Sequence, residues 1–117
     1  MLGLGVVLGA FGAHALRSRL DAYSVGIYER AVFYHFVHAL GLFAVSVLPK
    51  TGLLSPNSAS CVCSLLLAGV VLFSGSLYVL AVTGVRILGA ITPIGGMCFI
   101  AAWFLLAFTL LRGAQRG

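Results

Sequence analysis

The chain has 117 residues, of which 62% are apolar and only 8% are charged, with a formal net charge of +5. Soluble domains average about 45–50% apolar and about 25% charged residues, so this composition excludes an ordinary water-soluble fold. The length suits a single domain covering residues 1–117. Most of the chain is therefore expected to have lipid as its solvent.

Four apolar runs predict membrane-spanning helices, at residues 2–16, 31–48, 61–82 and 87–111. A span needs about 20 mostly apolar residues, and lipid cannot satisfy stray backbone groups, so each run should be helical. The first run is short and carries the tripeptide AHA, but a basic start typical of a signal peptide does not precede it, so we expect a retained helix. The predicted fold is an all-α membrane protein, a compact bundle of four transmembrane helices.

Basic residues lie in the predicted loops and ends. An even number of spans predicts both termini on one side of the membrane, called side A, and the opposite side is called side B. Side A holds Lys50, Arg112 and Arg116, and side B holds Arg17, Arg19, Arg30 and Arg86. Arg17 and Arg19 directly follow the first run, which favours a cytoplasmic side B. The charge suits anionic lipid headgroups better than nucleic acid, because no basic stripe with interleaved aromatic residues is present.

Polar side chains within the runs gather in the leaflet next to side B. The stretch YERAVFYHFVHAL carries two of the three histidines in an otherwise apolar setting. A polar ring that faces lipid lacks partners, so we expect these side chains to face the bundle interior as a candidate polar pocket. The predicted pocket residues are His14, His35, His38, Ser74, Ser76, Tyr78 and Thr92.

The histidines allow several interpretations. In the structural one, each ring bonds a hydroxyl or carbonyl and fixes helix packing, as buried polar groups commonly do. A proton path, an open zinc site, or a haem held between His14 and either His35 or His38 are the alternatives. The three cysteines are interpreted as apolar filler, and no carboxylate accompanies the serines, so we predict neither a catalytic set nor a metal or cofactor.

Small residues and one proline predict how the helices pack. Gly5, Gly9 and Ala13 are spaced by four and form a stripe where another helix can approach. The sequence TPIGG, with Pro93, Gly95 and Gly96, predicts a kink in the last helix or, alternatively, a broken helix lining a substrate cavity. Glu29 is interpreted as a negative charge at the start of the second helix, where the helix dipole favours it.

Four segments carry a resemblance to a known family: GAFGAHAL, YHFVHALGL, FSGSLYVLAVTG and LGAITPIGGMCFIAAW. They are similar to an uncharacterised family of small membrane proteins that includes bacterial YgdD and YwdK and human transmembrane protein 256. The resemblance covers nearly the whole chain and implies four spans, and against the family pattern we expect this chain to start inside the first helix, without the usual short leader. It implies a plasma or inner membrane for a bacterial member and an organellar membrane for a eukaryotic one. It assigns no activity to the motif positions, which here are His14, His38, Ser74, Gly75, Ser76, Tyr78, Pro93, Gly95 and Gly96.

The functional prediction is a non-enzymatic structural or accessory membrane component, packed in the bilayer against a second copy or another membrane protein. The lack of a legible catalytic set and the small-residue stripe favour it. The alternatives are a small carrier or channel that uses the polar pocket near side B, and a metal or haem protein that uses the histidines.

Overall fold

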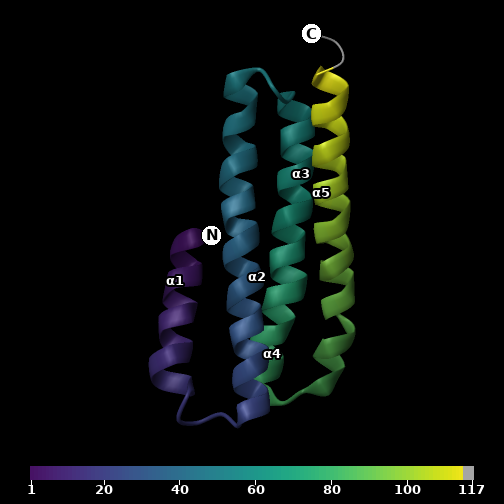
Figure 1. Ribbon diagram of the computed structural model, residues 1–117. Helices are drawn as coiled ribbons and strands as arrows, with labels where there is room; N and C mark the ends of the chain where they lie inside the picture. Colours follow the sequence, from purple (N-terminus) through teal and green to yellow (C-terminus); the bar gives the residue numbers. More distant parts are fainter. Residues whose placement is uncertain (115–117) are drawn as a thin grey trace.

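The computed structural model describes residues 1–114, and every regular segment in this part of the chain is helical. The segments are α1 (Leu2–Phe11), η1 (Gly12–Leu16), α2 (Ala22–Val47), η2 (Leu48–Thr51), α3 (Pro56–Gly69), η3 (Val70–Ser74), α4 (Gly75–Thr83), η4 (Arg86–Ala90) and α5 (Thr92–Ala114). Because η1 and η3 are π turns that continue the helices before them, the chain forms a bundle of four rods (Figure 1). The predicted all-α bundle is confirmed.

Three rods are long and apolar enough to cross a membrane: Ala22–Thr51, Pro56–Thr83 and Arg86–Gly113. The first rod, Leu2–Leu16, is shorter, and its N-terminal end reaches about half-way along α2 (Figure 1). The placement of both termini on one side therefore stays a prediction. Arg116, which we assigned to side A, lies outside the described residues.

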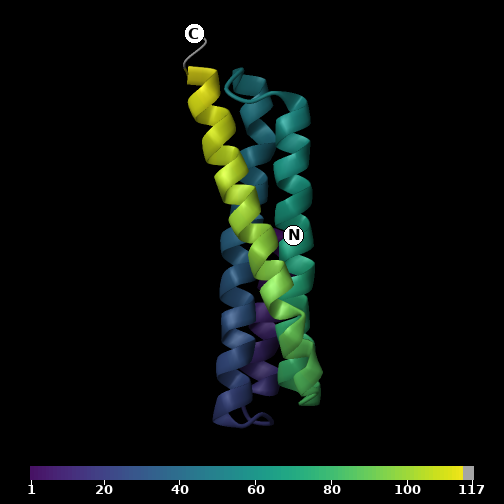
Figure 2. The ribbon, with the colours of Figure 1, turned by 90° about the vertical axis from the view of Figure 1, so that its right-hand side faces the viewer.

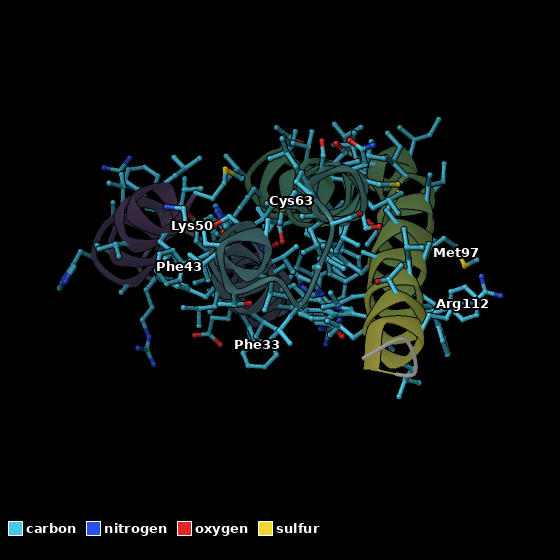
Figure 3. The ribbon with its side chains drawn as sticks, turned by 90° about the horizontal axis from the view of Figure 1, so that it is seen from above. Phe33, Phe43, Lys50, Cys63, Met97 and Arg112 are labelled. Carbon is cyan, nitrogen blue, oxygen red and sulfur yellow. The ribbon has the colours of Figure 1, made fainter. Side chains whose placement is uncertain are left out.

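The rods lie side by side in an elongated bundle of 55 × 26 × 17 Å. Seen along the bundle, α1 and α5 stand at opposite ends, with α2 and the α3–η3–α4 rod between them (Figure 3). The α5 helix is inclined to the other rods (Figure 2). Large apolar side chains such as Phe33, Phe43 and Met97 are exposed and point outward, as expected of helices that face lipid (Figure 3).

The second helix begins at Ala22, before the start predicted at residue 31. Asp21 caps it by accepting a hydrogen bond of 2.7 Å from the backbone nitrogen of Ser24, and this bonding lowers the pKa of the Asp21 carboxyl. The interpretation of Glu29 as a residue at the helix start is therefore wrong, because Glu29 lies inside α2. The distance along the helix from Arg30 to Lys50 is about 30 Å, so the predicted run 31–48 matches the hydrocarbon thickness.

Pro93 lies in the first turn of α5, and not inside a continuous α-helix as the predicted kink requires. The short η4 segment ends at Ala90, α5 begins at Thr92, and the exposed Pro93 occupies its first turn. A proline is tolerated there because the first backbone N–H groups of a helix have no partner within it. Gly95, one turn later, is buried, and it is a packing residue at a close contact between α5 and η3.

The predicted small-residue stripe on the first rod is present in part. Gly5 is buried against the ring of Phe36, and a Cβ at Gly9 would lie 3.5 Å from a methyl group of Val32. Ala13 is exposed instead, and the contact with α2 continues through Gly12, where a Cβ would overlap the ring of Tyr28. A helix has 3.6 residues per turn, so a stripe spaced strictly by four rotates away from the contact face.

We expect Gly12→Ala to destabilise the bundle and Gly9→Ala to be harmless. The added methyl group at Gly12 must displace the Tyr28 ring, which is held by a hydrogen bond of 2.7 Å from its hydroxyl to the Leu8 carbonyl oxygen. Overpacking of this kind costs about 1–3 kcal/mol, whereas Gly9→Ala should gain up to about 1 kcal/mol of helix propensity. Thermal unfolding in detergent, followed by circular dichroism, measures both, and equal unfolding temperatures would contradict the contact.

Candidate functional site

A layer of buried polar side chains separates two apolar clusters. One cluster holds Leu16, Ile27, Tyr28, Ala31, Leu77 and Ala81. The other holds Val45, Leu54, Ala59, Val62, Leu66, Val70, Phe99 and Ala102. The buried polar residues are His35, His38, Ser74 and Ser76. On α2, both histidines fall between the parts of the helix that contribute to the two clusters, which places the polar layer at their junction.

His35 links three rods. The side chain is 2% exposed, and its Nε2–H donates to the Met1 carbonyl oxygen at 3.1 Å. That tautomer leaves Nδ1 as an acceptor for the hydroxyl of Tyr78 on α4, at 3.2 Å. The Tyr78 ring also packs edge-on against Tyr28, with ring centroids 5.0 Å apart. Both ring nitrogens of His35 are thus satisfied by the protein itself.

His38 is bonded at one nitrogen only. Its Nδ1–H donates to the Tyr34 carbonyl oxygen, one turn earlier, at 2.8 Å. The ring is 4% exposed and stacks on Phe99 of α5, with centroids 3.4 Å apart and planes 11° apart. This tautomer makes Nε2 an acceptor with a free lone pair, and no residue among 1–114 donates a hydrogen bond to it.

The two buried serines also differ in whether their polar groups have hydrogen-bond partners. The Ser76 hydroxyl donates to the Phe73 carbonyl oxygen at 2.9 Å and shares a hydrogen bond of 2.8 Å with Thr92, which ties α4 to the first residue of α5. Ser74 lies in the π turn η3 with 0% exposure, and its hydroxyl has no hydrogen-bond partner within the described residues. Ser76 therefore joins two rods, whereas Ser74 carries an unpaired polar group.

We expect opposite effects from removing the two hydroxyls. Ser76→Ala should cost about 1 kcal/mol, because it removes the hydrogen bond between the two rods and leaves the Thr92 hydroxyl with only its longer bond of 3.4 Å to the Leu88 carbonyl oxygen. Ser74→Ala should be neutral or stabilising, because it deletes a buried hydroxyl that bonds none of residues 1–114. Thermal unfolding of the two variants side by side checks the pair, since each loses the same single oxygen atom. A Ser74→Ala variant as unstable as Ser76→Ala would reveal a bond at Ser74.

The structure does not bring His14 into the polar layer, contrary to the prediction. His14 is exposed on η1, two residues after Gly12, so it lies towards the opposite side of the rod from Gly12, which faces α2. Haem ligation between His14 and a histidine of α2 is therefore not supported. Among residues 1–114, no three His, Cys, Asp or Glu side chains come together as a metal site would require.

Two grooves flank the layer. A groove of about 360 Å³ between the first rod and α2 is lined by Gly12, Arg17, Tyr28 and Glu29, among others. A groove of about 540 Å³ between α2 and α5 is lined by aromatic residues and by His38. Sequence reasoning missed the aromatic lining because its members, such as Phe99 and Trp103, are ordinary in an apolar span. Their spacing by four along α5 was the available signal.

Comparison with known proteins decides the family. Residues 8–96 match the model of a family described as proteins of unknown function, DUF423. The chain belongs to the DUF423 family. The resemblance inferred from the sequence motifs is thereby confirmed, because the relatives include YwdK.

The relatives of this DUF423 protein are named as membrane proteins. UPF0382 membrane protein SH2409 of Staphylococcus haemolyticus is 47% identical over 109 residues, covering 93% of this chain and 87% of that protein. UPF0382 membrane protein YwdK of Bacillus subtilis is 45% identical over 111 residues, covering 93% of this chain and 88% of that protein. No solved structure matches the chain. Together with the three long apolar rods, the relatives establish an integral membrane protein.

Proposed function

We propose that this protein is a non-enzymatic structural or accessory component of its membrane, which packs against a second copy or another membrane protein. One observation carries the proposal: two of the four buried polar residues, His35 and Ser76, bond different rods to one another. The His35–Tyr78 and Ser76–Thr92 pairs and the Tyr28–Leu8 bond each join two segments of the bundle. Polar groups used in this way rigidify a membrane bundle and leave little free for chemistry.

The placement of the acidic residues supports the non-enzymatic part. The chain has only two, Asp21 and Glu29, and both are exposed. Asp21 caps α2, and Glu29 lies near the charged end of the same helix. Neither is hydrogen-bonded to a buried histidine or serine. A catalytic set needs a nucleophile, a base and a group that orients the base, all within reach of each other.

Native mass spectrometry after gentle extraction tests the proposal. We expect the 12.2 kDa chain to be released together with a second copy or a distinct protein, in a fixed ratio. Chemical cross-linking in intact membranes before extraction should trap the same complex. A chain that stays monomeric in both experiments, at native abundance, would contradict an accessory role.

A small carrier is the second candidate, because Nε2 of His38 has no partner among residues 1–114 and its ring lines a groove. A carrier moves protons or a solute across the bilayer, so purified protein in proteoliposomes should dissipate a pH gradient faster than empty liposomes do. His38→Phe should abolish that flux if the ring nitrogen takes part. A pH gradient that decays no faster than in empty liposomes would exclude proton transport by this protein.

A further inference from the structure

We propose that the groove between α2 and α5 binds a lipophilic phenol, a neutral aromatic ring that carries a hydroxyl group and an alkyl chain, with the hydroxyl donating to Nε2 of His38. The proposal does not depend on the accessory role. It starts from His38, the buried histidine whose ring lines a groove and whose second nitrogen has no partner within the described residues.

The tautomer of His38 determines which ligand groups can bind. Because Nδ1–H is held by the Tyr34 carbonyl oxygen at 2.8 Å, Nε2 carries a lone pair and no proton. It can accept a hydrogen bond from a hydroxyl, but it cannot donate one to a ketone, an ester or a quinone carbonyl. Stacking on Phe99 at 3.4 Å covers one face of the ring, so the ligand must approach its edge.

The depth of the groove selects a lipophilic and neutral ligand. His38 lies about 12 Å along α2 from Arg30, close to the middle of a hydrocarbon layer about 30 Å thick. At that depth water is scarce, so a molecule that brings a hydroxyl needs an acceptor, and the unpaired Nε2 needs a donor. A carboxylate would arrive without a cation, since no Lys or Arg of residues 1–114 lines this groove.

The lining selects an aromatic ring. Tyr34, Phe73, Phe99 and Trp103 form much of the wall around His38, and Tyr34 and Phe73 have ring centroids only 4.4 Å apart. Aromatic walls favour a planar ligand through offset-stacked and edge-to-face contacts. The volume of about 540 Å³ lies within the usual range of small-molecule sites and leaves room for an alkyl chain along α5 towards Ala107.

Binding can be followed by the fluorescence of Trp103, because it is the only tryptophan of the chain and it lines the groove. The probe is a phenol whose long 4-alkyl chain carries two bromine atoms, which quench nearby tryptophan fluorescence. It is titrated into the full chain in lipid nanodiscs. The control probe is its methyl ether, which keeps the shape and the bromines but has no hydrogen to donate.

We expect saturable quenching of Trp103 by the phenol, with an affinity about tenfold above that of the methyl ether, the value of one good hydrogen bond in an apolar site. In His38→Phe, which keeps a ring to stack on Phe99, the affinity for the phenol should fall to that of the ether, and the affinity for the ether should not change. If the parent chain binds the methyl ether with an affinity within twofold of its affinity for the phenol, the proposal is overturned. This comparison uses the parent chain alone, so it holds even if His38→Phe fails to fold. Trp103 quenching that rises linearly with the concentration of the probe in the membrane, without saturation, would also overturn the proposal. It would show that the groove is filled by ordinary lipid.

Discussion

Gly95→Ala should destabilise this bundle more strongly than Gly12→Ala, although each substitution adds only one methyl group. A Cβ at Gly95 would overlap the backbone nitrogen of Phe73 and lie 2.8 Å from its Cα. A side chain can rotate away from such a contact, but backbone within η3 can move only with its rod. We therefore expect a loss of about 3 kcal/mol, the upper end of the range for overpacking, and a shift of α5 away from η3.

Gly96→Ala provides the matched control on the neighbouring residue of the same helix. A Cβ at Gly96 would lie 3.8 Å from the Phe73 ring, an ordinary contact distance. The substitution should therefore be neutral or gain up to about 1 kcal/mol from the higher helix propensity of alanine. Thermal unfolding of both variants in the same detergent measures the difference. Equal stability would show that α5 does not approach η3 as closely as the structure indicates.

The apolar runs predicted the fold because composition and run length are strong signals in a membrane chain. The helix ends were predicted less well, since they depend on single capping residues. Asp21 and Ser55 begin helices α2 and α3 before the apolar runs start, at residues that look like loop from hydropathy alone. Pro93 illustrates the same limit, because a proline in the first turn and a proline at a kink have the same local sequence.

The candidate site was predicted in part. His35, His38, Ser74 and Ser76 are buried in the bundle as expected for polar groups in lipid, and His35 and Ser76 find partners on other rods. His14 was misplaced because sequence position gives an estimate of its depth in the membrane but not the rotation of the first rod. The π turns at η1 and η3 add a residue to a turn and shift the face that later residues present, and the sequence carries no clear signal for them.

His35→Leu should destabilise the bundle by about 1–3 kcal/mol, with Tyr78 as the main cause. Leucine fills a similar volume but cannot accept the hydrogen bond of the Tyr78 hydroxyl, which lies 3.2 Å from Nδ1. That hydroxyl is then stranded within the spans, between rods that pack against each other. His35→Gln can still accept and donate, so it should lose less.

A double-mutant cycle isolates the pair. Tyr78→Phe alone should lose stability, because it leaves Nδ1 of His35 unpaired, whereas Tyr78→Phe introduced into His35→Leu should restore stability by removing the stranded hydroxyl. We expect a coupling energy of about 1 kcal/mol, within the range measured for hydrogen bonds between membrane helices. Additive effects of the two substitutions would contradict the bond. A measured coupling energy would instead show that Nδ1 of His35 is occupied by Tyr78 and cannot bind an external ligand. His38 is then the histidine of the polar layer that can accept a hydrogen bond from a ligand.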